Sequence, residues 1–364
     1  MKISLIAGAR PNFMKIAPII HAIQKTQSTN GITYRLIHTG QHFDEKMSET
    51  FFKQLNIPEP DVNLNCGGGS QAEQTASIMI AFEKELLENP TDLVLVVGDV
   101  TSTMACSIVA KKLHTKVTHV EAGIRSFDLS MPEEINRMVT DSITDYFFTT
   151  TLWAGENLLK AGVSNKKIFF VGNVMIDTLL ANRSKFVQPD FWNTLTLEKG
   201  NYFVLTLHRP ANVDESEKLK ELIDEITASV EGKPILFPIH PRTAKVFQEL
   251  GIQADNLHIV DPLGYLEFNY LVENAMGVIT DSGGITEETT VMGVPCITLR
   301  DTTERPETIT MGTNELVGTN PKAIKPFLDK LVSGNWKKGS IPEKWDGKAA
   351  ERIVEILQKM NQNI

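Results

Sequence analysis

Short apolar runs alternate with helix-like segments along the whole chain, and this alternation constrains its fold more than any other feature. Strands that are separated by helices form parallel sheets with helices on both faces. The sequence therefore predicts an α/β protein. The expected strands are 2–7, 33–38, 93–97, 116–120, 146–149, 168–171, 202–207, 235–238, 257–259, 277–280 and 296–299, and the expected helices include 71–88, 102–113, 132–141, 217–230 and 243–250.

The length of 364 residues is sufficient for two domains, each with its own core. We expect a boundary after Gly172-Asn173, because a fresh series of strands and helices begins after the irregular stretch 188–201. The prediction is two doubly wound Rossmann-like domains, 1–172 and 173–347, that face a cleft. The amphipathic last helix, within 348–364, packs either on the second domain or back on the first. Ligands of such sheets bind at the carboxyl ends of the strands.

Composition excludes several classes of protein. The formal net charge of −9 argues against a nucleic-acid or anionic-membrane binder. Cys66, Cys106 and Cys296 lie far apart, which predicts buried thiols in a reducing compartment. The first apolar run is too short for a secretory signal, and no run is long enough to span a bilayer. We therefore expect a cytoplasmic protein with no membrane insertion.

The segment 280–308 predicts a holder for a nucleoside diphosphate. A buried strand ends at an Asp-Ser-Gly-Gly turn, and the small residues Ser282, Gly283 and Gly284 open a helix whose N-terminal N–H groups favour an anion. Glu288 lies one turn further along, where its carboxylate could accept hydrogen bonds from ribose hydroxyls. Arg305 follows the next apolar run and could bind phosphate.

Polar groups also follow the strands of the first domain. Asp99 and Glu121 come after successive strands and should face the same crevice. Glu133 and Arg137 lie four residues apart on one helical face, with Glu134 pointing elsewhere. The other candidates at strand ends are Arg10, Lys15, Gln41 and His42 in the first domain, and His208, Arg209 and His240 in the second.

Carboxylates, histidines and arginines in one cleft offer general acids and bases and charge stabilisation for a leaving diphosphate. No Gly-x-Gly-x-x-Gly follows a strand, no Walker loop is present, and no spacing suggests a tight metal site. We therefore expect neither a nicotinamide cofactor nor a metal ion.

Assembled in order, these segments resemble the non-hydrolysing UDP-N-acetylglucosamine 2-epimerases of bacteria over nearly the full chain. The motifs that carry the resemblance are Gly-Ala-Arg-Pro at 8–11, Thr-Gly-Gln-His at 39–42, Gly-Asp at 98–99, His-Val-Glu-Ala-Gly at 119–123, Pro-Glu-Glu-Ile-Asn-Arg at 132–137, Gly-Asn at 172–173, His-Arg at 208–209, Asp-Ser-Gly-Gly-Ile-Thr-Glu-Glu at 281–288 and Arg-Asp-Thr-Thr-Glu-Arg-Pro-Glu at 300–307.

The resemblance implies the two-domain glycosyltransferase B-type fold, a homodimer, and reversible inversion at C2 of a UDP-sugar for surface polysaccharide synthesis. It implies that UDP is eliminated to leave 2-acetamidoglucal and is then added back, without nicotinamide. It also implies residue roles. Asp99, Glu121 and Glu133 would be acid/base carboxylates and His208 a further catalytic residue, while Arg10, Lys15, Ser282, Glu288 and Arg305 would bind UDP.

Several alternatives remain open. The same fold could epimerise a 3-acetamido or uronic-acid sugar, release free N-acetylmannosamine by hydrolysis, transfer a glycosyl group, or sense a UDP-sugar without catalysis. The chain also departs from many relatives at Ala9 and Asn12. Its loop 65–71 carries no Arg or Lys, although some relatives bind an activating UDP-sugar through a basic residue there.

Overall fold

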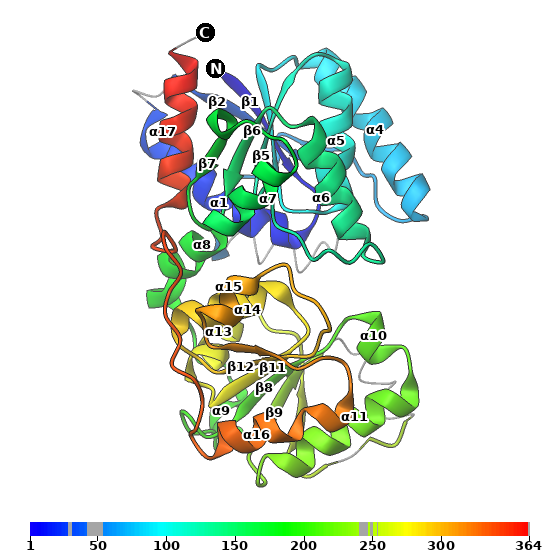
Figure 1. Cartoon of the computed structure of the whole chain (residues 1–364), viewed down its shortest axis with the longest axis vertical. Helices are drawn as coiled ribbons and strands as arrows, with labels where there is room; N and C mark the ends of the chain where they lie inside the picture. Colours follow the sequence, from blue (N-terminus) through cyan, green and yellow to red (C-terminus); the bar gives the residue numbers. More distant parts are fainter. Residues whose placement is uncertain (28–30, 42–53, 240–246, 248–249, 253, 363–364) are drawn as a thin grey trace. The chain divides into compact units, whose positions relative to one another are not determined.

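The computed structural model describes the chain except for residues 28–30, 42–53, 240–246, 248–249, 253 and 363–364. The chain divides into two compact units, Met1–Ala181 with Glu343–Ile364, and Asn182–Pro342 (Figure 1). The division falls at the end of helix α8 (Val174–Asn182), after the expected boundary at Gly172-Asn173. Contacts of α8 with the first unit explain this position, because Thr178 Oγ1 donates to the carbonyl of Met14.

The first unit contains a parallel sheet of seven strands in the order β3-β2-β1-β4-β5-β6-β7 within the described residues. Every side chain of β4 is buried, which is typical of a strand covered on both faces. The order reverses between β1 and β4, and ligands bind at such a point in doubly wound sheets. The strands are β1 Lys2–Ala7, β2 Thr33–His38, β3 Val62–Asn63, β4 Leu93–Val97, β5 Lys116–Val120, β6 Tyr146–Thr149 and β7 Ile168–Phe170.

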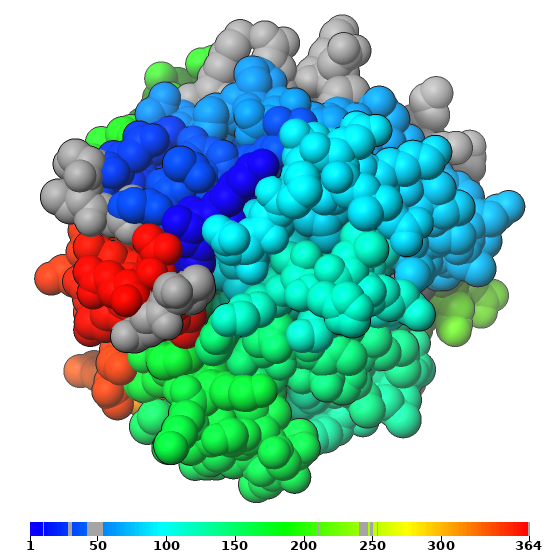
Figure 2. Space-filling view, turned by 90° about the horizontal axis from the view of Figure 1, so that it is seen from above, coloured from blue at the N-terminus to red at the C-terminus, as the bar shows by residue number. Residues whose placement is uncertain are grey.

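Helices cover both faces of this sheet, with α4, α5 and α6 side by side on one face and α1 with α17 on the other (Figure 1). The C-terminal α17 lies beside the first segments of the chain (Figure 2), and Lys25 Nζ pairs with Glu351 Oε1 at 2.9 Å. Besides α8, the described helices of the unit are α1 Arg10–Lys25, α4 Gln71–Glu88, α5 Thr101–Lys112, α6 Pro132–Ile143, α7 Leu152–Lys160 and α17 Ala349–Asn361, with a 3-10 turn at Asn165–Lys167.

The second unit repeats this plan with a parallel sheet of six described strands in the order β10-β9-β8-β11-β12-β13, and its order reverses between β8 and β11. Its strands are β8 Phe203–Thr206, β9 Ile235–Pro238, β10 Leu257–Val260, β11 Gly277–Thr280, β12 Cys296–Thr298 and β13 Asn314–Leu316. Its helices are α9 Phe191–Thr194, α10 Pro210–Val213, α11 Ser216–Ser229, α13 Tyr265–Asn274, α14 Gly283–Met292, α15 Pro306–Thr310 and α16 Lys325–Val332, with 3-10 turns at Arg183–Lys185 and Pro321–Ala323.

The prediction of parallel sheets covered by helices on both faces is confirmed. Strands β3 and β13 were not predicted, because two- and three-residue strands carry too few apolar positions to stand out. The expected helix at 243–250 falls mostly outside the described residues. Cys66, Cys106 and Cys296 are buried thiols with no disulfide, as predicted. Among the helices that the structure describes, none has the length and apolar character to cross a membrane.

Candidate functional site

The reversal point of the first sheet brings together side chains that follow β1, β4 and β5. Lys15, in the second turn of α1, reaches Glu121 beyond β5, with 2.5 Å between Nζ and Oε2. Both side chains are buried, at 11% and 1% exposure. Gly98 lies against this pair, because a Cβ there would stand 2.9 Å from Lys15 Nζ and 3.5 Å from Glu121 Oε2. A buried ammonium at this distance favours the ionised form of the carboxylate.

Glu121 has an unusual backbone conformation. Its φ is +70°, in the left-handed region that residues with a Cβ rarely adopt. Such strain costs about 1–3 kcal/mol and persists where the surrounding structure imposes it, often at functional sites. The surrounding structure therefore holds the backbone of Glu121 in a strained conformation that sets the direction of its carboxylate.

A buried ionic cluster behind Glu121 provides that constraint. His119 Nδ1 lies 2.7 Å from Asp141 Oδ1, and His119 Nε2 lies 2.8 Å from the carbonyl oxygen of Gly98. Asp141 also pairs with Arg125 at 2.7 Å and accepts from the N–H of Gly123. Both ring nitrogens of His119 thus lie within hydrogen-bonding distance of an oxygen atom. The cluster ties the end of β4 to the loop that follows β5.

Charge compensation sets the state of Asp141. Burial alone would raise the pKa of its carboxyl, but the charges and hydrogen bonds of His119 and Arg125 outweigh burial and hold that pKa below its ordinary value. Asp141 therefore acts as an ionised brace, and nothing in the local sequence motif distinguished it from an ordinary helical residue.

Asp99, which follows β4, is held by Arg137 of α6. Arg137 Nη1 lies 2.5 Å from Asp99 Oδ2, and Asn136 Nδ2 donates to the carbonyl of Asp99. The expectation that Glu134 points away from Arg137 is wrong, because Glu134 Oε2 lies 2.8 Å from Arg137 Nη2. Residues three apart on a helix are neighbours as well as residues four apart.

Glu134 is also fixed from the other side, where it accepts hydrogen bonds from the N–H groups of Ser126 and Phe127. These donors come from the loop after β5 and select Glu134 as the internal brace. Glu133, at the start of α6, is half-buried.

Gln41 follows β2 and is engaged at the start of α5. Its Oε1 accepts from the N–H and the hydroxyl of Ser102, at 3.2 and 2.9 Å. Arg10 begins α1, at the carboxyl end of β1. The side chain of Arg10, and His42 and His240 altogether, lie outside the part of the chain that the structure describes.

The reversal point of the second sheet holds His208, after β8, and Asp281, after β11. His208 Nδ1 lies 2.7 Å from Asp281 Oδ1. Arg209 contributes its backbone N–H to Asp281 Oδ2, and its Nε donates to the Asp281 carbonyl. The two predicted residues of the His-Arg motif thus meet the strand that leads into the Ser-Gly-Gly turn.

Helix α14 begins directly after this turn. Ser282 is its N-cap residue but makes no side-chain cap hydrogen bond among the described residues. The first N–H groups of a helix have no carbonyl of a preceding turn to bond, so those of Gly283 and Gly284 point out of the helix. Gly283 lies close to the Glu304 carboxylate, since a Cβ at this position would stand 2.7 Å from Glu304 Oε1. The geometry suits an anion such as phosphate.

The remaining predicted residues are buried beside α14. Glu288 accepts a hydrogen bond from the hydroxyl of Tyr265 at 2.8 Å. Arg305 Nε pairs with Glu287 Oε1 at 2.6 Å, and Arg300 pairs with Glu304. Tyr265 was missed, because it belongs to no motif and meets Glu288 only through the fold.

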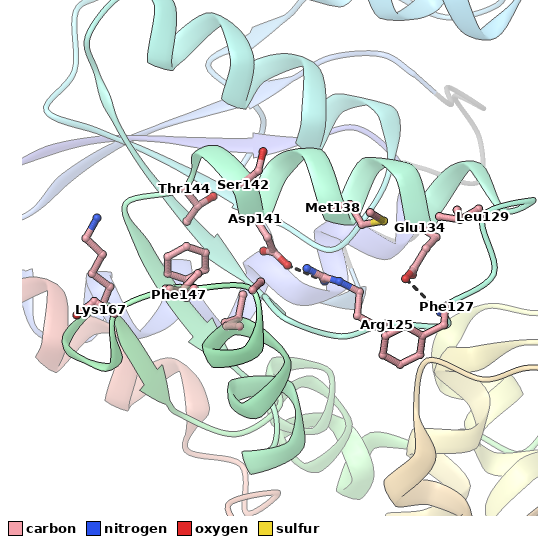
Figure 3. Close-up of a pocket in the computed structure, with 15 residues that line it drawn as sticks. Arg125, Phe127, Leu129, Glu134, Met138, Asp141, Ser142, Thr144, Phe147 and Lys167 are labelled. Carbon is pink, nitrogen blue, oxygen red and sulfur yellow. Dashed lines mark hydrogen bonds and ion pairs between the residues drawn. The ribbon is translucent and has the colours of Figure 1, made fainter.

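A pocket of about 760 Å³ lies between α6, α7 and the loop before α6 (Figure 3). Arg125, Glu134 and Asp141 form part of its wall while they brace the carboxylate site. Its described lining includes none of the predicted site residues, so we do not assign it to the substrate. The apolar lining of this pocket comes from Phe127, Leu129, Met138, Phe147, Leu158 and Val163.

The described part of the chain holds no group of three or more His, Cys, Asp or Glu side chains arranged for a metal ion.

Two parallel-sheet α/β domains with polar groups at both reversal points define a protein of the glycosyltransferase B-type fold. A family model described as UDP-N-acetylglucosamine 2-epimerase matches residues 24–358. The chain therefore belongs to the UDP-N-acetylglucosamine 2-epimerase family and is an epimerase, a class of isomerase.

Individual relatives agree with this assignment. A UDP-N-acetylglucosamine 2-epimerase of Methanocaldococcus jannaschii is 45% identical over 98% of this chain and 99% of its own. The crystal structure of the M. jannaschii enzyme in complex with UDP-GlcNAc and UDP matches with a TM-score of 0.87 over 99% of this chain and 100% of that chain, at 44% identity. A UDP-2,3-diacetamido-2,3-dideoxy-D-glucuronate 2-epimerase of Pseudomonas aeruginosa is 38% identical over 99% of this chain and 100% of its own. The family resemblance is confirmed and extends to an archaeal relative.

Proposed function

We propose that the chain interconverts UDP-N-acetylglucosamine and UDP-N-acetylmannosamine by eliminating UDP and adding it back. A base removes the C2 proton, the C1–O bond breaks with its electron pair going to UDP, and 2-acetamidoglucal remains. A proton then enters C2 from the opposite face while the diphosphate oxygen attacks C1. The observation that carries this proposal is the buried Lys15–Glu121 pair, because it holds a carboxylate against an ammonium group in a strained conformation at a strand end.

Acid/base roles fall to the carboxylates of the first unit and to His208 of the second. Asp99, Glu121 and Glu133 differ in exposure, and the half-buried Glu133 and the 25% exposed Asp99 are the more open of the three. Groups of this kind each contribute about 10²–10⁴-fold to the rate. Arg137 would orient Asp99 for this work.

UDP binding falls mainly to the second unit. The N-terminus of α14, with Ser282, Gly283 and Gly284, would hold the diphosphate, and Glu288 would accept hydrogen bonds from the ribose. Charge on the diphosphate grows as C1–O breaks, so donors placed there stabilise the transition state more than the ground state. Residues proposed to complete substrate binding are Arg10, Lys15, Gln41, His42, Arg209, His240 and Arg305.

Proton NMR of the protein with UDP-N-acetylglucosamine in D₂O, without added cofactor, tests the reaction. A manno-configured UDP-sugar carrying deuterium at C2 is the expected product. Free N-acetylmannosamine would indicate the hydrolysing reaction instead, and protium retained at C2 in the epimer would contradict C2–H cleavage.

Glu121→Gln tests the proposed acid/base role of Glu121. We expect it to keep UDP binding and to lose about 10²-fold or more in turnover. Glu85→Gln is a matched control, because Glu85 is also a buried glutamate in an ion pair, at 2.6 Å from Arg35 Nε, but lies on α4. Full turnover in Glu121→Gln, or equal losses in both variants, would refute the role of Glu121.

A second substrate is favoured by one observation, the 38% identity to the P. aeruginosa enzyme that is named for a diacetamido uronic-acid sugar. The same assay with UDP-2,3-diacetamido-2,3-dideoxy-D-glucuronate discriminates the two. A higher kcat/KM for the uronic sugar would overturn the preference for UDP-N-acetylglucosamine.

We also propose a cytoplasmic homodimer that serves surface polysaccharide synthesis, with light scattering of the purified chain as the test of the dimer.

A further inference from the structure

The ring of His208 has one nitrogen against a buried carboxylate and the rest toward solvent. Its Nδ1 lies 2.7 Å from Asp281 Oδ1, and the His208 side chain is 60% exposed whereas Asp281 is 0% exposed. The two residues follow β8 and β11, which are hydrogen-bonded neighbours at the reversal point of the second sheet. The pair is thus fixed by the sheet, with a rigid carboxylate and an accessible imidazole.

Every described contact of the Asp281 side chain is with a donor. Oδ2 accepts from the N–H groups of His208 and Arg209, at 3.0 and 2.9 Å, and from Asn212 Nδ2 at 3.1 Å. A carboxylate surrounded by donors is ionised and can only accept hydrogen bonds. The proton between Asp281 and His208 must therefore reside on Nδ1, which leaves Nε2 of the neutral ring as an acceptor.

Electrostatics agree with this geometry. Burial by itself would raise the pKa of Asp281, but the hydrogen bond with the His208 side chain and those from the two backbone N–H groups hold that pKa below its ordinary value. Among the described residues, charged groups beside this strand end include Arg209, whose Nε donates to the Asp281 carbonyl, and the Arg300–Glu304 pair next to Gly283.

A purely structural role would account for only part of these contacts. The two N–H groups and Asn212 tie the start of α10 to β11, and this function needs no imidazole. The Nδ1 contact is an additional link, made by the side chain of His208. It also selects one tautomer of an exposed ring.

We propose that Asp281 is a positioning residue, which fixes His208 in the Nδ1–H tautomer so that its proton exchange with the substrate passes through Nε2. When Nε2 takes a proton, the imidazolium is balanced by the Asp281 carboxylate, which keeps its charge throughout. The inference rests on the proposed function, because it gives His208 a part in the epimerisation.

Kinetics of Asp281→Asn, His208→Gln and the double variant test the proposal. We expect Asp281→Asn to lower kcat about tenfold or more, with a smaller effect on KM and on UDP affinity. In the His208→Gln background the same change should lower kcat less than about twofold, since residues that act through one another are non-additive. Equal losses in both backgrounds would show that Asp281 acts only on structure.

A spectroscopic readout separates this inference from the proposed function. In ¹⁵N-histidine NMR of the unaltered protein, the neutral His208 ring should be protonated at Nδ1 and bare at Nε2. Asn212→Ala is the matched control, because it removes a different hydrogen bond to Asp281 and should leave this tautomer in place. The Nε2–H tautomer in the unaltered protein would overturn the inference, and this measurement does not depend on the folding of any variant.

The two failures are distinguishable. Full turnover in His208→Gln would remove His208 from the proposed mechanism, and the role of Asp281 in catalysis with it. An Nε2–H tautomer together with an inactive His208→Gln would overturn the positioning by Asp281 alone.

Discussion

Removing the cation from the buried Lys15–Glu121 pair should destabilise the first unit strongly. Lys15→Met keeps most of the apolar stem and deletes the charge, while Glu121 remains 1% exposed. Removing one partner of a buried ion pair costs about 3–5 kcal/mol, because the other charge loses its compensation. For a unit of this size the cost corresponds to a fall in Tm of about 6–20 °C.

The double variant Lys15→Met/Glu121→Gln distinguishes loss of compensation from loss of packing. Replacing both charges of a buried pair by uncharged groups often leaves the free energy of unfolding unchanged. We therefore expect the free energy of unfolding of the double variant to exceed that of Lys15→Met by at least about 2 kcal/mol. Differential scanning calorimetry of the four proteins of this cycle measures the coupling.

Lys25→Met is the matched control, because it makes the same substitution on the same helix. Lys25 is 72% exposed and its partner Glu351 is 48% exposed, so the loss of this pair should cost less than about 1 kcal/mol. If Lys15→Met costs no more than Lys25→Met, or if the two changes in the double variant simply add, the pair does not compensate the charge of Glu121.

The same variant separates two roles for Lys15. If Lys15 mainly keeps Glu121 ionised, a UDP titration of Lys15→Met gives nearly unchanged affinity while epimerisation is lost. If Lys15 binds the nucleotide, as its motif predicts, the affinity for UDP falls as well.

Two further predictions concern stability. Gly98→Ala should cost at least about 1 kcal/mol more than Gly232→Ala. Both glycines have positive φ (+66° and +71°), but of these two only Gly98 has an atom within 4 Å of an added Cβ, Lys15 Nζ at 2.9 Å. Equal shifts in Tm for the two variants would contradict the close approach. Burial raises the pKa of Asp177 to about 6, against the effect of its hydrogen bonds from the N–H groups of Ala349 and Ala350. A raised acid pKa favours the folded state at low pH, so up to about 3 kcal/mol is lost as pH rises from 4 to 6, and Asp177→Asn should lack this loss; a Tm difference between variant and parent that is independent of pH would refute it.

Strand positions were predictable because parallel strands buried on both faces appear as continuous apolar runs. The run 93–97 matches β4 at both ends, and the residues after it and after β5 lie at the same edge of the sheet, because β4 and β5 are paired parallel strands. The order of strands along the chain thus sufficed to place Asp99 and Glu121 after neighbouring strands.

Pairings within the site could not be predicted in the same way. Glu133 and Glu134 are both helical neighbours of Arg137, and the choice between them is made by N–H donors of Ser126 and Phe127 that precede α6. A helical pattern contains no information about such donors, since their position depends on how the loop after β5 folds against α6.

Each proposed acid or base with a described ion-pair partner receives it from another secondary-structure element. Glu121 receives Lys15 from α1, Asp99 receives Arg137 from α6, and His208 receives Asp281 from the end of β11. Each partner thereby fixes the orientation of the acid or base that it contacts. Replacing a partner should therefore move kcat, whereas replacing a group that only binds UDP should move KM. Partners of acid/base groups and residues that bind UDP both follow strand ends, so their positions do not distinguish them. The different effects of their replacement on kcat and KM do.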